Sequence, residues 1–157
     1  MITAESILEE KGSEMICVSP DATIQDALTL MIEKRIGAIL IKESENCIGI
    51  WTERDLMRNT VSEGFDPKTA KISDYMTTGL ISIAHDADAL QLADQFLGRR
   101  LRHLLVERDG KFIGLLSAGD VIKAALQDRA QQVEEYSEIV HLEFYEKWRW
   151  KKQLQKK

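Results

Sequence analysis

Two short segments of the sequence place a hydroxyl side chain and a carboxylate three residues apart, directly after an apolar run. The first, GIWTERD, ends with Thr52 and Asp55, and the second, GLLSAGD, ends with Ser117 and Asp120. A hydroxyl at a helix start can donate to an anion such as phosphate, and an ionised aspartate can accept from both hydroxyls of a ribose. The same spacing is typical of a capping box, which stabilises a helix start without any ligand. For a single copy we favour capping, and both interpretations stay open until the rest of the chain is considered.

These segments belong to an internal repeat that covers most of the chain. A shift of 65 residues, which takes Gly49 to Gly114, aligns the sequence with itself without a gap. The aligned pairs include Ile7 with Ile72, Asp21 with Asp86, Arg35 with Arg100, and Leu40 with Leu105. Because such a repeat indicates a duplicated structural unit, we expect both copies to fold alike.

Each copy predicts the element order β-α-β-β-α. Apolar runs at 15–18 and 36–41 indicate strands, and the apolar positions 24, 27, 28 and 31 between them lie on one face of a helix. A polar turn leads to a third strand at 47–51, and a second helix is expected to begin at Thr52. The second copy repeats this pattern, with Asp-Gly in the turn between its last two strands.

The predicted fold class is α/β (α+β), with the two repeats stacked face to face about a pseudo-twofold axis. One repeat of about 50 to 60 residues has too small an interior to be stable alone, so we expect the two copies to bury each other's sheets. The segment SEGFDPKTA at 62–70 is rich in turn-forming residues and is expected to link them. Thr23 with Asp26, and Asp88 with Gln91, are expected to cap the first helix of each copy.

The chain resembles a tandem pair of CBS domains (the cystathionine β-synthase motif), also called a Bateman module. The resemblance covers roughly residues 3–127 and is carried by SPDATIQDALTLMIEKRIGAILI and GIWTERD in the first copy, and by ISDYMT, RLRHLLV and GLLSAGD in the second. It implies one CBS motif at 3–62, a second at 71–127, and a helical extension at 128–157.

This resemblance also implies a ligand. Paired CBS motifs form clefts that commonly bind AMP, ADP, ATP or S-adenosylmethionine, with the motif hydroxyl on phosphate and the aspartate on the ribose. Position by position, that assigns Thr52 and Asp55 in one copy and Ser117 and Asp120 in the other, and we add Arg54 as a further candidate. Gly49 and Gly114, on the strands before the motifs, are expected to allow close backbone approach.

Two basic residues and five apolar residues complete the predicted site. In CBS domains a His or Arg at the position of Arg102 and His103 often reaches a phosphate across the cleft, so we expect these two to serve the first motif. The alternative is a surface arginine and a half-buried histidine. The adenine pocket is expected to include Ile16, Val18, Ile36, Leu80 and Ile83, which are also plausible core residues.

The sequence does not indicate an enzyme. It has no GxSxG, P-loop or GxGxxG motif, and its three histidines are far apart without metal-ligand spacing. We therefore predict no catalytic residue, no metal and no required cofactor, with an adenine nucleotide as a possible ligand. A hydrolase built from carboxylates that the fold brings together is the alternative.

Composition favours a cytoplasmic protein. The net charge of −5 argues against general electrostatic binding to nucleic acid. No secretory signal and no long apolar run are visible, and Cys17 and Cys47 are interpreted as reduced thiols.

The C-terminal segment is expected to continue the last helix without a break. Val133, Tyr136, Val140, Phe144 and Trp148 recur at helical spacing and form an apolar stripe. It would pack on its own CBS pair, on the same helix of a second subunit in a homodimer, or on another protein, and we prefer a partner. The overall prediction is a regulatory module that senses an adenine nucleotide and signals to a partner. The alternatives are a ligand-free interaction scaffold, or association with nucleic acid or a membrane through the basic end at 146–157.

Overall fold

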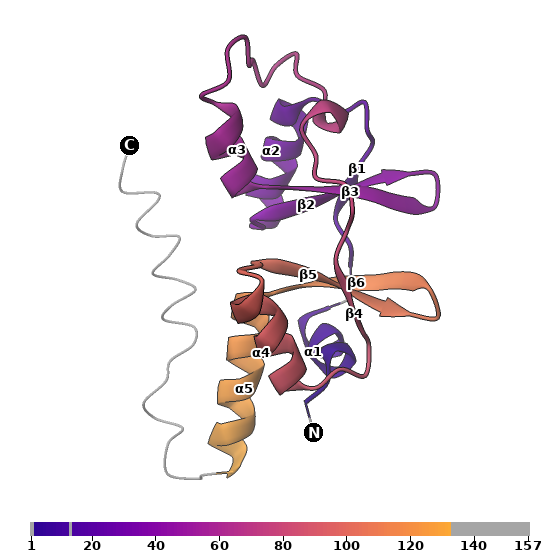
Figure 1. The fold of residues 1–157 in the computed structure, drawn as a ribbon, viewed down its shortest axis with the longest axis vertical. Helices are drawn as coiled ribbons and strands as arrows, with labels where there is room; N and C mark the ends of the chain where they lie inside the picture. The colour runs from indigo at the N-terminus through magenta and orange to yellow at the C-terminus, as the bar shows by residue number, and fades with distance from the viewer. Residues whose placement is uncertain (1, 13, 133–157) are drawn as a thin grey trace.

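The computed structural model of the chain describes residues 2–12 and 14–132 (Figure 1). The first repeat contains β1 (Cys17–Val18), α2 (Ile24–Lys34), β2 (Ala38–Glu43), β3 (Asn46–Thr52) and α3 (Glu53–Asn59). The second repeat contains β4 (Ser82–Ala84), α4 (Ala89–Gly98), β5 (His103–Arg108), β6 (Lys111–Ser117) and α5 (Ala118–Gln132). The predicted β-α-β-β-α order is confirmed in both copies. The predicted C-terminal stripe begins at Val133 and lies outside the described residues.

Each repeat folds around a three-stranded sheet of the same topology. The strand orders are β1-β2-β3 and β4-β5-β6, with a parallel first pair and an antiparallel second pair. Leu40 lies opposite Ile50 in the first sheet, and Leu105 lies opposite Leu115 in the second. These are the same pairs under the 65-residue shift, so the sequence repeat is also a repeat of strand register.

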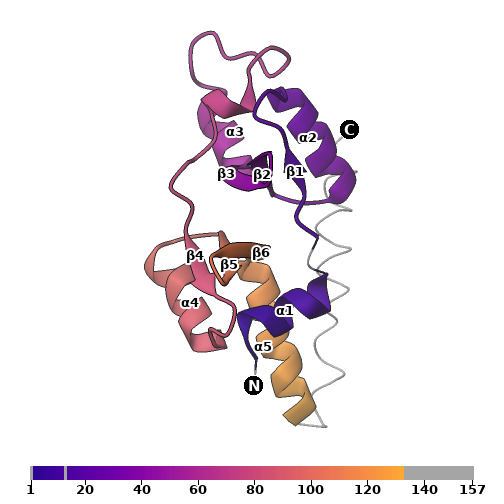
Figure 2. The same cartoon turned by 90° about the vertical axis from the view of Figure 1, so that its right-hand side faces the viewer.

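The two sheets face each other, and the helices lie on their outer sides (Figures 1 and 2). Because side chains alternate along a strand, Ile39 and Ile41 point to the helices while Leu40 points to the other sheet. Ile39 and Ile41 belong to the hydrophobic cluster beneath the helices of the first repeat. Leu40 and its counterpart Leu105 are 1% and 2% exposed. Neither belongs to the hydrophobic cluster beneath the helices of its own repeat. The predicted stacking of the repeats is therefore confirmed.

The segment that precedes each repeat packs on the other repeat. Helix α1 (Ala4–Lys11) contributes Ile7 and Leu8 to the core of the second repeat, and the amide of Ala4 donates to the carbonyl of Ala87 at 2.9 Å. The short 3-10 helix η1 (Ile72–Asp74) contributes Ile72 to the core of the first repeat. The two repeats are thus joined by these exchanged segments, residues 4–11 and 72–77, as well as by their stacked sheets.

Local signals in the sequence account for the helix starts. Thr23 with Asp26 and Asp88 with Gln91 each form a capping box, as predicted. No helix in the described part of the chain is both long and apolar enough to cross a membrane.

Candidate functional site

The first motif begins helix α3 at the end of strand β3. Thr52 is the N-cap, and its backbone N–H and its hydroxyl both donate to Oδ2 of Asp55, at 2.9 Å each. The backbone N–H of Asp55 donates back to Thr52 Oγ1 at 3.3 Å. On the other carboxylate oxygen, Arg58 Nη1 lies 4.0 Å from Oδ1, the outer limit of an ion pair. The hydroxyl and the carboxylate of this motif therefore hold each other in a capping box.

The second motif has the same internal geometry at the start of helix α5. The backbone N–H and the hydroxyl of Ser117 donate to Asp120 Oδ2 at 2.7 and 2.8 Å, and the N–H of Asp120 donates to Ser117 Oγ at 3.2 Å. In addition, Lys11 Nζ lies 2.7 Å from Asp120 Oδ2 and donates to the carbonyl of Leu115 at 2.9 Å. The two motifs therefore differ in the cation beside the carboxylate, which is Lys11 at 2.7 Å from Asp120 and Arg58 at 4.0 Å from Asp55.

Lys11 changes the ionisation of the second carboxylate. Burial alone would raise the pKa of Asp120, but the hydrogen bonds from Lys11 and Ser117 outweigh it, so the pKa lies below its ordinary value. Asp120 is therefore a paired anion across the neutral pH range. A ribose hydroxyl approaching its Oδ2 would meet an oxygen that already accepts three hydrogen bonds.

Both motifs lie at the same end of the molecule. The β2–β3 and β5–β6 hairpins project to one side, on the right in Figure 1, so β3 and β6 both run away from that side toward α3 and α5. The first N–H of each helix is already bonded to backbone: Glu53 N donates to Gly37 O, and Ala118 N donates to Arg102 O, at 3.1 Å each. Each helix start therefore has fewer free amides to offer an anion than an unpaired helix N-terminus would have.

A small cavity of about 110 Å³ lies between the sheets. It is lined by residues of both repeats: Ile50, Thr77, Gly79, Leu80, Ile81, Leu101, His103, Leu105 and Leu115. Ligand sites usually have roughly 300–1,000 Å³, so this cavity is smaller than a complete small-molecule site. His103 lies directly opposite Ser117 in the β5–β6 register, and Ile50 lies two residues before Thr52, so the lining of the cavity adjoins both motifs.

The predicted basic residues are divided between the motifs. Arg54 is half-buried within the first turn of α3. The backbone of Arg102 and His103 pairs with residues 117 and 118 of the second motif, through the Ala118–Arg102 hydrogen bond and the strand register. To contact the first motif, these side chains would have to reach across the space between the two sheets, where His103 and Ile50 line the same cavity.

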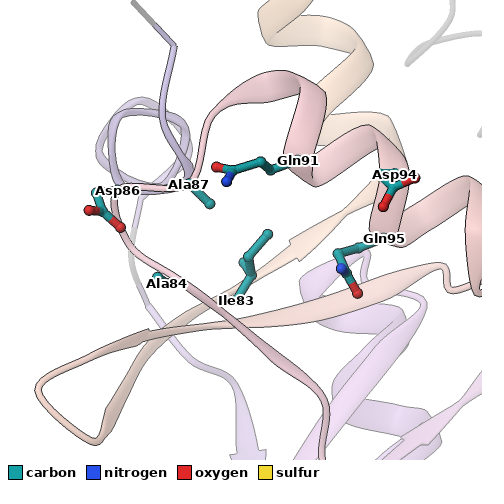
Figure 3. A pocket seen from close by; sticks show the side chains of 7 residues that line it. All are labelled: Ile83, Ala84, Asp86, Ala87, Gln91, Asp94 and Gln95. Atoms are coloured by element: carbon teal, nitrogen blue, oxygen red, sulfur yellow. The ribbon is translucent and has the colours of Figure 1, made fainter.

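The five residues predicted for the adenine pocket lie in three parts of the structure. Ile16, Val18 and Ile36 pack against the core of the first repeat, and Leu80 lines the cavity between the sheets. Ile83 packs against the core of the second repeat and lines a larger cavity of about 370 Å³ between β4 and α4 (Figure 3). That cavity contains no motif residue; its polar lining is Asp86, Gln91, Asp94 and Gln95.

The space beside the two strand glycines is filled by the protein itself. A Cβ built on Gly49 would lie 2.3 Å from Met76 Sδ, and one built on Gly114 would lie 2.6 Å from both Cδ atoms of Leu8. The close approach predicted at these glycines is therefore made by the exchanged segments.

The sequence analysis missed Lys11 as a residue of the second motif. The repeat nevertheless contained a signal, because the 65-residue shift aligns the charged Lys11 with the apolar Met76.

Among the described residues, no group of three or more His, Cys, Asp or Glu side chains is placed to hold a metal ion.

Burial raises the pKa of both thiols, Cys17 and Cys47, so they are protonated and weakly nucleophilic at neutral pH.

Comparison with known proteins identifies the class that this fold and these motifs define. The sequence matches the CBS domain over residues 3–62 and 72–127, so the chain belongs to the CBS domain family as a tandem pair. A CBS-domain containing protein of Agrobacterium tumefaciens has 31% sequence identity and a TM-score of 0.75, with 79% of this chain and 99% of that chain covered.

Two further relatives show how this tandem pair occurs elsewhere. The mitochondrial CBS domain-containing protein CBSX3 of Arabidopsis thaliana is 30% identical over 128 residues, 78% of this chain and 62% of that protein. The chain thus spans less than two thirds of that relative. CBSX2, whose crystal structure is of a complex with AMP, has 26% identity and a TM-score of 0.61, with 73% of this chain and 90% of that chain covered.

Proposed function

We propose that this CBS pair is a non-catalytic regulatory module that binds an adenine nucleotide in the cleft between its repeats and signals the occupancy to a partner. The observation that carries the proposal is the placement of both hydroxyl-x-x-Asp motifs at helix starts on one end of two stacked sheets. The AMP complex of CBSX2 supports the ligand class. Because a ligand shifts only those equilibria for which its affinities differ, signalling requires an arrangement of the repeats or subunits that the nucleotide prefers.

We assign roles to the two ends of the ligand. The carboxylate of Asp55 accepts the ribose hydroxyls, and the hydroxyl of Thr52 turns from Asp55 to the phosphate, since a hydroxyl can rotate to suit its partner. The base lies toward the apolar cavity between the sheets, where Leu80 and Ile50 are placed to contact it.

Thermal unfolding with AMP, ADP, ATP and S-adenosylmethionine tests this proposal. A nucleotide at 100 times its dissociation constant should stabilise the folded chain by about 2.7 kcal/mol. Asp55→Asn should abolish or strongly reduce that shift, because the amide presents one acceptor and one donor group where the ribose needs two acceptors. Calorimetric titration would give the affinity directly.

The chain contains a matched control for this variant. Asp26 closes a capping box with Thr23 whose N–H donates to Asp26 Oδ2 at 3.0 Å, close to the 2.9 Å of the Thr52–Asp55 pair. Asp26→Asn should therefore cost similar helix stability while leaving nucleotide binding intact. Equal loss of binding in both variants, or no nucleotide shift in the unmodified chain, would refute the proposed function.

A second observation favours a homodimer as part of the same function. Three exposed apolar residues of the first repeat have exposed apolar counterparts at the matching positions of the second: Ile32 with Leu97, Met57 with Ile122, and Val61 with Leu126. Exposed apolar side chains that gather in patches mark interaction surfaces. A surface repeated by internal pseudo-symmetry suits a twofold dimer, in which each patch meets its equivalent on another copy. The same surface would support the ligand-free scaffold if no nucleotide binds.

A further inference from the structure

The end of helix α1 reaches into the second motif. Lys11, the last residue of α1, is held there by its hydrogen bonds to Asp120 Oδ2 and to the carbonyl of Leu115. Its side chain is 40% exposed and that of Asp120 is 24% exposed, so the pair lies at the rim of the motif. Leu8, one turn earlier in α1, is buried against Gly114 and anchors the helix at this position.

Within the described residues, the exchanged segment brings no equivalent cation to the first motif. The residue that matches Lys11 is Met76, which packs on Gly49 as Leu8 packs on Gly114. The cation beside Asp55 is Arg58, whose Nη1 is 4.0 Å from Asp55 Oδ1. Oδ2 of Asp55 accepts two hydrogen bonds, both from Thr52, whereas Oδ2 of Asp120 accepts three.

We propose that Lys11 is an internal occupant of the second motif, which closes that motif to a nucleoside and leaves the first motif as the binding site of the chain. The inference rests on the proposed function and names which of the two motifs is open. A ribose that engages both oxygens of Asp120 must first displace the ammonium of Lys11. The second motif therefore binds a nucleotide only when the side chain of Lys11 leaves it.

Two variants and one ligand test this inference. We would titrate the full chain with AMP by calorimetry and compare it with Lys11→Met, which gives the second repeat the residue of the first. The unmodified chain should bind one AMP per chain, and Lys11→Met should bind two, with the added site gaining about tenfold or more in affinity, as expected for removing a competing charge-assisted hydrogen bond. Lys11→Gln is a second variant that keeps a polar side chain if Met perturbs folding.

Two control variants test whether the added site depends on the second motif or only on the loss of a positive charge. Asp120→Asn in the Lys11→Met background should remove the added site, and Lys68→Met, which removes a charge from an exposed loop residue, should leave one site. The inference is overturned if the unmodified chain binds two AMP molecules, or if Lys11→Met leaves the number of sites unchanged or weakens binding.

The same titrations distinguish this inference from the proposed function. Absence of AMP binding in every variant would overturn both. If the unmodified chain does not bind but Lys11→Met binds one AMP through Asp120, the closure by Lys11 is supported and the assignment of the first motif is wrong.

Discussion

Met76 packs against the backbone of Gly49, so closely that a Cβ on Gly49 would lie 2.3 Å from the sulfur of Met76. The two residues come from different repeats, and the adjacent Ile50 and Thr77 exchange backbone hydrogen bonds at 3.0 and 2.8 Å. Gly114 and Leu8 form the equivalent contact in the second repeat. These contacts fasten each exchanged segment to the strand that leads to a motif, and so connect the motifs to the interface between the repeats.

We expect Gly49→Ala to destabilise the chain by about 1–3 kcal/mol, the usual cost of overpacking a close contact. The added methyl group meets Met76 near its Cβ as well as at its sulfur, so a rotation of the chain end does not relieve it. Urea unfolding followed by circular dichroism would measure the loss. In a double-mutant cycle, Met76→Ala should recover part of the stability; additive effects would contradict the contact.

We expect Asn59→Ala to destabilise the first repeat by about 1–3 kcal/mol, because it leaves a buried donor without a partner. Trp51 is fully buried, and its Nε1–H donates to Asn59 Oδ1 at 3.0 Å. The counterparts in the second repeat are Leu116 and Ala124, so no such bond exists there to compensate. Trp51→Phe combined with Asn59→Ala should cost less than the sum of the two changes. A loss below about 0.5 kcal/mol for Asn59→Ala would show that the bond contributes little.

We expect Lys11→Met to raise the pKa of Asp120 and to reduce the acid sensitivity of the fold. A native pKa below the unfolded value stabilises the chain above about pH 4, and the gain is lost as the pH falls through the native pKa. Since the pair is partly exposed, its contribution should be about 0.2–1 kcal/mol at neutral pH.

Carbon-detected NMR titration of the Asp120 carboxyl would measure this change in pKa. The carboxyl of Asp26, whose pKa is lowered by hydrogen bonds to Thr23, is the internal control and should titrate alike in both proteins. An unchanged Asp120 titration would contradict the role given to Lys11.

For the proposed homodimer, we expect Met57→Glu and Ile122→Glu each to shift the chain toward monomer. Both residues are largely exposed, so a charge there is tolerated in the monomer but not in an apolar interface. Sedimentation velocity across a concentration series would measure the change. Leu90→Glu is the matched control, because Leu90 is 79% exposed but its counterpart in the first repeat is the polar Gln25. A monomeric unmodified chain, or equal effects of all three changes, would refute the dimer surface.

Most of the architecture could be predicted from the sequence because it rests on local and periodic signals. The repeat, the apolar spacing of each first helix and the capping pairs at Thr23 and Asp88 all act within a few residues or at a constant shift. Both motifs were placed at helix starts for the same reason. The roles of Thr52 and Asp55 in ligand binding stay predictions, because a capping box forms with or without a ligand.

The sequence by itself determined two copies of one β-α-β-β-α unit, and with them the family, because repetition and side-chain periodicity are written along the chain. Only the tertiary structure decided that α1 and Ile72 cross to the opposite repeats, that Met76 and Leu8 fill the space beside the glycines, and that Lys11 reaches Asp120 across 109 positions. Contacts between residues so far apart depend on how the two sheets stack. Neither spacing nor composition encodes that arrangement locally, so two motifs that look alike in sequence acquire different electrostatic surroundings.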